Sequence, residues 1–403
     1  QSHLCRNPRV VKEANTLAAA GFDVTILTTF TYADLLEEDF KLIDTDKIKY
    51  KGIINMIPGH ASSWYRFKNR LERRIAGELI GRFNWENVQA LGYNYSANIK
   101  AAIAENADLY TCHQEVSTVI GCKLIERGFK VAFDFEDWYS NDLLADANKT
   151  RPIDLLKKYE KFALNNGVLN YTTSESMAKG FAEFANSKEP KILHNVFPLA
   201  ERELLDGQIK DRKDLTKTSI HWYSQTIGAG RGLEFIINSL KLVKSPVELH
   251  LRGNCSEEFK HELLAIFPTE NGHELFFHEL VPHKELLSRI AEHDIGLATE
   301  KSTPPSRDLT ITNKILQYLL GGIAVVASDT SGQKEVAREA PDSVFLFEND
   351  NKIEFSNALN SLIEDKGKLQ KAKDEALKIS TDKFCWEKQE QWLVDWITEV
   401  LKK

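Results

Sequence analysis

Short apolar, β-branched runs alternate with helix-like segments along nearly the whole chain. This alternation is typical of βαβ units, in which helices join parallel strands and cover the sheet, so the fold class is α/β. Strands are predicted at residues 23–28, 49–56, 108–113, 130–135, 168–173 and 191–193, and again at 219–223, 248–252, 275–278, 295–298, 324–327 and 344–347. Helices are predicted at residues 9–20, 63–80, 96–105, 116–127, 153–165 and 176–184, then at 232–243, 257–267, 284–292, 312–320, 333–338 and 354–364, with two more at the end.

The alternating pattern is interrupted once. Residues 197–218 are polar and charged and have little strand character, so we interpret them as a linker. A chain of 403 residues is long enough for two or three domains. The prediction is two doubly wound, Rossmann-like domains, residues 1–196 and 219–383, that face each other across a cleft. Open sheets of this kind bind ligands beyond the carboxyl ends of their strands.

Composition excludes several classes of protein. The net charge of -7 argues against a dedicated nucleic-acid binder, whose domains are usually basic. No stretch approaches the roughly 18 consecutive apolar residues of a membrane span. The cysteines are scattered and include no CxxC pair, which predicts unpaired thiols in a cytoplasmic protein. They are Cys5, Cys112, Cys122, Cys255 and Cys385.

The chain opens at Gln1 with a short polar stretch, and the first helical pattern begins by Arg9. A doubly wound domain is built from units that begin with a strand. We therefore expect the first strand of this domain to lie upstream of Gln1.

Two loops of the second domain carry groups suited to an anion. The run Gly228-Ala229-Gly230-Arg231-Gly232 follows a predicted strand and precedes a helix, where backbone N–H groups and an arginine can approach a phosphate. An ordinary strand-to-helix turn with a solvated arginine is the alternative. Lys314 lies in the first turn of the helix at 312–320, where a cation is unfavourable unless an anion shares the site.

These motifs together resemble the nucleotide-sugar domain of the GT-B glycosyltransferases, in particular the retaining family 4 enzymes. The resemblance rests on the run from Asn313 to Asp329, on the turn 228–234, and on the opening Asn7-Pro8-Arg9-Val10. It implies that Arg231 and Lys314 neutralise charge on the leaving diphosphate. It also implies that the last helix, residues 384–403, packs back on the first domain.

The resemblance implies a set of donor-binding positions. Gln317 would hold the ribose, although the family usually has a glutamate at this position. The family's other glutamate would fall at Leu309, so the sugar-facing loop departs from the pattern. The remaining donor-binding positions are Gly228, Gly230, Gly253, Val281 and Asn313.

The acceptor side has two candidate residues in the first domain. His113 ends the strand at 108–113, and Glu136 belongs to the run Asp134-Phe135-Glu136-Asp137 that ends the next strand. Burial could raise a carboxyl pKa there enough for acid or base catalysis. The alternatives are a loop histidine bonded to local backbone and a solvated strand end. We predict no metal site, because no histidine accompanies the carboxylates at ligand spacing.

Apolar residues at positions 64, 67, 71, 75, 79 and 83 predict an amphipathic helix. The opposite surface of this helix holds six Arg or Lys against two Glu. The commoner outcome for such a helix is that its apolar side packs on the core and its basic face is solvated. The alternative is peripheral contact with an anionic membrane.

The predicted function is transfer of a sugar from a nucleoside diphosphate sugar to a hydroxyl of a glycan or lipid-linked saccharide. The resemblance implies retention of configuration, without a metal and without a cofactor other than the donor. Two alternatives remain open. One is a nucleotide-sugar 2-epimerase, with His113 and Glu136 as its acid/base pair. The other is a catalytically silent nucleotide-sugar-binding subunit, which Gln317 and the unusual loop 302–308 would favour.

Overall fold

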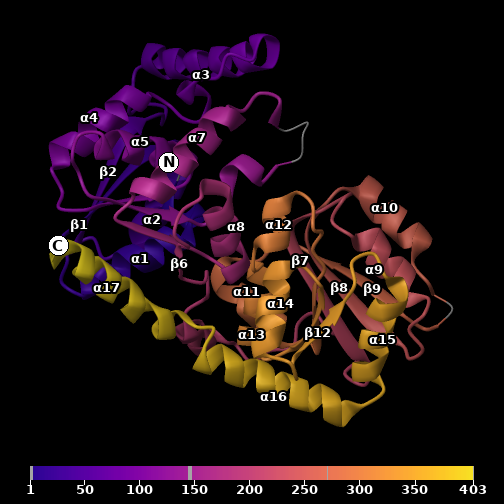
Figure 1. Cartoon of the computed structure of the whole chain (residues 1–403). Helices are drawn as coiled ribbons and strands as arrows, with labels where there is room; N and C mark the ends of the chain where they lie inside the picture. Colours follow the sequence, from indigo (N-terminus) through magenta and orange to yellow (C-terminus); the bar gives the residue numbers. More distant parts are fainter. Residues whose placement is uncertain (1–2, 144–147, 270, 403) are drawn as a thin grey trace. The chain divides into compact units, whose positions relative to one another are not determined.

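The computed structural model describes residues 3–143, 148–269 and 271–402. The chain folds into two compact units (Figure 1). Unit 1 comprises Gln1–Leu193 and Gln389–Lys403, and unit 2 comprises His194–Lys388. Each predicted strand is present, with ends that differ from the prediction by at most a few residues.

Unit 2 contains one six-stranded parallel sheet. Its strands are β7 (Thr218–Ile227), β8 (Val247–Cys255), β9 (Glu274–His278), β10 (Ile295–Ala298), β11 (Ala324–Ser328) and β12 (Val344–Phe347). They are arranged in the order β12-β11-β10-β7-β8-β9. The helices are α9 (Leu233–Leu240), α10 (Glu257–Ile266), α11 (His283–Ala291), α12 (Pro305–Leu309), α13 (Asn313–Gly321), α14 (Ser331–Glu339), α15 (Lys352–Ile363) and α16 (Lys366–Asp382).

Alternate residues of β7 face opposite sides of this sheet. Ile220 and Trp222 join the main apolar core, which also holds side chains of α9, α10 and α15. His221 lies on the other face, against Tyr318 of α13. Helices therefore cover both faces, as in a doubly wound domain.

Unit 1 has two parallel sheets among its described residues. The first consists of β1 (Val24–Phe30) and β2 (Ile48–Asn55). The second has the order β3-β4-β5-β6, formed by β3 (Tyr110–His113), β4 (Val131–Phe135), β5 (Leu169–Thr172) and β6 (Lys191–Ile192). The helices are α1 (Pro8–Ala19), α2 (Ala33–Leu42), α3 (Ser63–Phe83), α4 (Tyr95–Glu105), α5 (Glu115–Ile125), α7 (Ile153–Asn166) and α8 (Glu175–Ala185). A strand upstream of Gln1 stays a prediction.

Helix α2 was not predicted from the sequence. Its N-cap residue, Tyr32, makes no side-chain capping bond, and Phe40 and Leu42 are exposed. The buried residue of α2 is Asp39. Its carboxylate accepts hydrogen bonds from His3 and from the Tyr50 hydroxyl, both at 2.7 Å, and these hold the helix in place. Neither a cap signal nor an apolar stripe therefore marks this helix.

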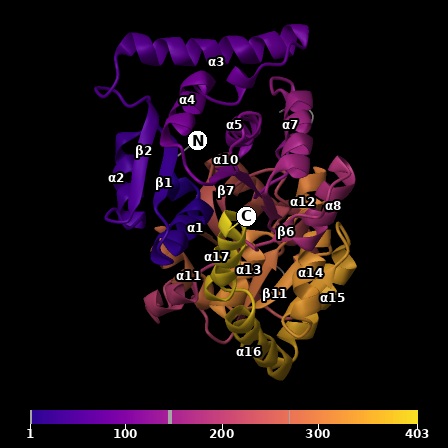
Figure 2. The ribbon, with the colours of Figure 1, turned by 60° about the vertical axis from the view of Figure 1, so that its left-hand side comes forward.

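Helix α3 contradicts the core-packing interpretation of residues 64–83. The residues it buries are Asn69, Ala76 and Ile80, whereas the apolar residues Trp64 and Phe67 are exposed. Gly81 lies near Thr150: a Cβ added at Gly81 would meet the Thr150 side chain at an ordinary contact distance of 3.5 Å. Figure 2 shows α3 along the outer edge of unit 1.

The segment predicted as a linker packs on unit 2. Arg289 donates to both carboxylate oxygens of Asp206 at 2.7 and 2.8 Å, and Arg252 donates to Asp211. The backbone N–H of Lys213 donates to the buried Glu248 at 3.1 Å. The polar composition of residues 197–218 therefore supplies partners for charged groups of unit 2.

Helix α17 (Trp386–Lys402) begins in unit 2 and belongs to unit 1 from Gln389 onward. Within unit 1, the Thr16 hydroxyl donates to Glu390 at 3.0 Å, and the rings of Tyr171 and Trp396 lie 6.3 Å apart. All five cysteines are free thiols. Across the described ranges, no helix combines the length and apolar character needed to cross a membrane.

Gly296 of β10 makes room for the ring of Tyr318. A Cβ at this position would lie 2.3 Å from the ring, so Gly296→Ala must displace a fully buried side chain. We expect Gly296→Ala to lower the free energy of unfolding by about 1–3 kcal/mol, the usual cost of overpacking a core. Urea denaturation measures it. Gly228→Ala is the control, because its added Cβ would meet only an ordinary contact at 3.6 Å. Equal stability of the two variants would contradict the packing argument.

Candidate functional site

The strand order of unit 2 reverses between β7 and β10. From β7 the chain adds β8 and β9 on one side, and β10, β11 and β12 lie on the other. Because all six strands are parallel, the loops after β7 and β10 leave the sheet at the same edge and side by side. Such a switch point is where open α/β sheets bind ligands. The predicted groups Arg231 and Lys314 both belong to segments that follow these two strands.

The turn between β7 and α9 depends on glycine. Gly230 and Gly232 have φ angles of 77° and 79°, which other residues rarely adopt. Between them Arg231 is exposed and donates to the Ser224 hydroxyl at 3.1 Å. Near the end of β8, a Cβ at Gly253 would lie 2.3 Å from the carbonyl oxygen of Ser224 in β7. The two strand ends therefore approach each other at a distance that only glycine permits.

Lys314 has an internal counter-ion that the sequence argument did not foresee. Its Nζ lies 2.5 Å from a carboxylate oxygen of Glu300, which follows β10, and 5.6 Å from the centre of the Trp222 ring. Glu300 therefore supplies the anion that a cation at a helix start requires. The inference that Lys314 needs a ligand for charge balance is wrong. Lys314 can still bind a phosphate by exchanging one anion for another.

Gln317 is buried, and its Oε1 accepts a hydrogen bond from the Tyr223 hydroxyl. The side chain predicted to bind the ribose is thus already hydrogen-bonded to a residue of β7. Asn313 accepts from the Asn195 side chain at 3.4 Å, and Val281 is half-buried just before α11. Leu309 ends α12, and the neighbouring Asp308 accepts from the Ser331 hydroxyl at 2.5 Å. Tyr223 and Glu300 are thus the site residues that sequence reasoning missed.

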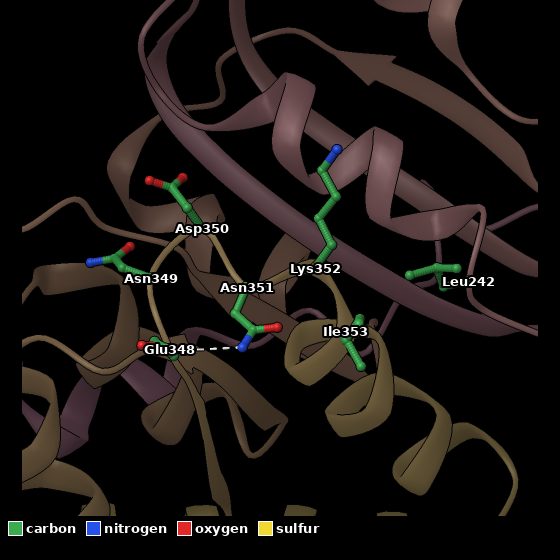
Figure 3. Close-up of a pocket in the computed structure, with 7 residues that line it drawn as sticks. All are labelled: Leu242, Glu348, Asn349, Asp350, Asn351, Lys352 and Ile353. Carbon is green, nitrogen blue, oxygen red and sulfur yellow. Dashed lines mark hydrogen bonds between the residues drawn. The ribbon is translucent and has the colours of Figure 1, made fainter.

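A surface pocket of about 610 Å³ lies elsewhere in unit 2 (Figure 3). It is lined by Leu242 and residues 348–353, after β12 and at the start of α15. The Asn351 amide donates to Glu348 at 3.0 Å within it. None of the predicted site residues lines this pocket, so it is separate from the predicted donor site.

Unit 1 brings His113 into a buried charged cluster with Arg9, Glu13 and Asp134. Arg9 donates to both oxygens of Asp134, at 2.6 and 2.9 Å. The two ring nitrogens of His113 face carboxylates, with Nδ1 2.9 Å from Asp134 and Nε2 3.5 Å from Glu13. The Tyr171 hydroxyl donates to Glu13 at 2.7 Å. Two cations balance two anions when His113 is an imidazolium.

The charges in this cluster shift one another's pKa values. Burial alone would lower the pKa of His113, but Glu13 and Asp134 outweigh it and raise that pKa. Burial alone would raise the pKa of Asp134, but Arg9 and His113 lower it. The imidazolium form of His113 is therefore favoured by its neighbours, with Nδ1 at hydrogen-bond distance from Asp134. Burial and the Asp134 charge also raise the pKa of Glu13, so the charge on His113 depends on that of Glu13.

The carboxylates after Asp134 behave differently. Burial, with the Asp134 charge adding to it, raises the pKa of Glu136, whose side chain accepts from the Asn7 amide at 3.4 Å. Burial and the Glu136 charge raise the pKa of Asp137 to about 7. A carboxyl that titrates near neutral pH can both donate and accept a proton. Asp137 thus joins Glu136 as a candidate acid or base.

Two clusters have donor atoms close enough for a metal ion: Glu13, His113 and Asp134 in unit 1, and Asp211, Glu292 and His293 in unit 2. In space, then, a histidine does accompany the carboxylates, contrary to the sequence argument. Each cluster already contains a guanidinium, however. Arg9 uses both oxygens of Asp134, and Arg252 donates to Asp211. A metal would have to displace these cations, so both sets fit internal ion-pair networks better.

The chain was compared with known proteins. Residues 223–365 match the family described as "Glycosyl transferases group 1". No curated protein matches the chain in sequence. Among solved structures, it is similar to sucrose-phosphate synthase from Thermosynechococcus elongatus, at 14% identity and a TM-score of 0.69, covering 98% of this chain and 94% of that chain. It is also similar to a glycosyltransferase from Rickettsia africae (14%, TM-score 0.64, 98% and 94%) and to Anabaena HepE in complex with UDP (15%, TM-score 0.63, 98% and 97%).

These comparisons confirm the predicted fold class. The chain has the parallel-sheet, Rossmann-like domains of GT-B glycosyltransferases over nearly its whole length. The family match over residues 223–365 supports a glycosyltransferase, and the structural neighbours share its fold. The matched segment contains Arg231, Lys314 and Gln317, together with the missed residues Tyr223 and Glu300.

The charged state of His113 predicts a pH dependence. Because its folded-state pKa is raised, protonated His113 stabilises the fold fully below its ordinary pKa of about 6.5. This contribution is lost as the pH rises through the folded-state value. We expect the melting temperature of the parent to exceed that of His113→Gln most at the acidic end, and the difference to shrink toward alkaline pH. His261→Gln, at an exposed histidine of α10, is the control and should give a difference that does not vary in this way. A gap for His113→Gln that widens with pH would refute the imidazolium assignment.

Proposed function

We propose that this chain transfers a sugar from a nucleoside diphosphate sugar to a hydroxyl group of a glycan or lipid-linked saccharide. The reaction retains the configuration of the anomeric carbon, uses neither a metal nor a further cofactor, and takes place in the cytoplasm. The nucleotide in this proposal is uridine diphosphate, since the complexes of Anabaena HepE contain UDP and UDP-glucose.

One observation carries the proposal. At the switch point of unit 2, the glycine turn with Arg231 and the start of α13 with Lys314 follow adjacent strands. This edge offers two cations and two helix N-termini to an anion, and it lies within the segment that matches the glycosyltransferase family.

In the proposed reaction, the acceptor oxygen forms a bond to the anomeric carbon of the donor sugar on the same face that the diphosphate leaves, which retains the configuration. The bond between that carbon and the β-phosphate oxygen breaks, and the diphosphate leaves with the electron pair. Arg231 and Lys314 stabilise the negative charge that develops on it, the kind of preorganised electrostatic effect that usually contributes most to catalysis. The acceptor's hydroxyl proton passes to a base, for which Glu136 and Asp137 are candidates because their pKa values are raised.

The alternatives differ in what they consume. A transferase releases UDP from UDP-glucose or another UDP-sugar only when an acceptor is supplied. An epimerase changes the sugar without an acceptor, and a silent subunit binds the nucleotide without either reaction. The epimerase needs His113 as a proton carrier, which its engagement with two carboxylates disfavours. A thermal-shift screen of nucleotide sugars identifies the donor, and chromatography of the products with and without a panel of saccharide acceptors separates the three functions.

The roles of Arg231 and Lys314 predict a specific loss of affinity. Each forms a charge-assisted contact of about 1.5–3 kcal/mol, so Arg231→Ala and Lys314→Ala should each weaken UDP binding about ten- to a hundredfold. Uridine binding should change little, because the base and ribose are held elsewhere. Calorimetric titration with UDP and with uridine measures both.

Glu300→Gln sharpens this test. It removes the internal counter-ion of Lys314, so UDP no longer competes with a carboxylate and should bind more tightly than to the parent. Lys371→Ala, at an exposed lysine of α16, is the control for loss of a positive charge. Unchanged UDP affinity in both Arg231→Ala and Lys314→Ala would show that the diphosphate binds elsewhere.

A further inference from the structure

Helix α3 presents an apolar stripe to solvent. Trp64 is 71% exposed, Phe67 54%, Leu71 41% and Ile75 47%. Their spacing of three or four residues places them along one side of the helix. The buried residues of α3, Asn69, Ala76 and Ile80, lie on the opposite side. Large apolar side chains gathered on one exposed face of a soluble unit mark an interaction surface.

Further exposed aromatic groups lie at the C-terminal end of α3, off the line of the stripe. Phe83 is 72% exposed, and Trp85, just after the helix, is 65% exposed. Asn84 ends the helix in the left-handed conformation, and the N–H of Trp85 donates to the carbonyl of Leu79. Tryptophan is enriched where apolar and aqueous phases meet, because its ring is amphipathic.

Basic side chains flank the stripe on both sides. At 100° per residue, Lys68 lies on one flank and Arg70 and Arg74 lie on the other. All three are exposed. Lys68 has a loose ion pair with Glu72 at 3.8 Å, whereas Arg70 and Arg74 have no ion-pair partner among the residues that the structure describes. This positive charge is local, since the whole chain carries a net charge of -7.

We propose that α3 lies flat on an anionic lipid bilayer, with Trp64, Phe67, Leu71 and Ile75 among the acyl chains and the basic flanks at the phosphate headgroups. An apolar stripe with tryptophan, bordered by Lys and Arg, matches the two components of such a surface. A second copy of the chain fits less well, because pairing the stripes would place basic flanks against basic flanks. The surface is independent of the donor site and of the proposed reaction.

Sedimentation of the full chain with vesicles tests the proposal. At low salt the parent should pellet with vesicles of phosphatidylcholine mixed with phosphatidylglycerol and stay in solution with phosphatidylcholine alone. Trp64→Ser/Phe67→Ser removes apolar contact, and Arg70→Glu/Arg74→Glu reverses two charges. Each pair should lower the partition coefficient at least about tenfold, because the first removes apolar burial and the second turns attraction to the anionic surface into repulsion.

Matched controls use exposed residues outside α3. Ile353→Ser in α15 and Lys371→Glu in α16 should bind vesicles as the parent does. Equal recovery of the parent in the supernatant with both vesicle types would overturn the proposal, and so would α3 variants that still pellet. Size-exclusion chromatography with light scattering addresses self-association. The bilayer proposal would be overturned if the parent is a dimer that does not bind vesicles and the α3 variants are monomers. The apolar stripe would then be assigned to contact with a second copy of the chain.

Discussion

The parallel direction of the six strands in unit 2 is the constraint on which its site depends. Parallel strands force every strand-to-helix loop to one edge of the sheet, and the reversal of strand order places the loops after β7 and β10 side by side. Residues far apart in the chain, such as Arg231 and Lys314, thereby belong to one region. The glycines of the β7–α9 turn and Gly253 then allow backbone to approach closely there.

Several charged side chains in both units are paired with an opposite charge within the fold. Lys314 is paired with Glu300, Arg9 with Asp134, and Arg289 with Asp206. A buried charge is tolerated only when a partner offsets its lost hydration. In unit 2 the Lys314–Glu300 pair is partly exposed, so Lys314 is positioned by its partner and still accessible to the diphosphate of the proposed reaction. In unit 1 the Arg9–Asp134 pair is fully buried, and the carboxylates beside His113 raise the pKa of its ring.

Local patterns in the sequence predicted the strands of both units and the bounds of α13 almost to the residue, because alternation and glycine turns are encoded locally. The partner of Lys314 was not predictable, since Glu300 lies in a loop 14 residues earlier and only the fold brings the two together. Helix α2 carried no capping signal. For α3 the periodicity was right and the buried face was wrong, because the helix packs through Asn69, Ala76 and Ile80 rather than through its large apolar residues. Burial is decided by tertiary packing, which periodicity alone does not contain.

Tyr318 has a consequence for how unit 2 can move. Strands β7 and β10 are paired over only two residue pairs, and the Tyr318 hydroxyl lies 3.2 Å from the carbonyl oxygen of His221 and 3.4 Å from that of Leu297, one on each strand. Its ring fills the space left by Gly296, and its neighbour Gln317 accepts from Tyr223. Tyr318 therefore ties helix α13 to β7 and β10 at once. A movement that carried the backbone of α13 away from the sheet would break both hydroxyl contacts and leave the space beside Gly296 unfilled.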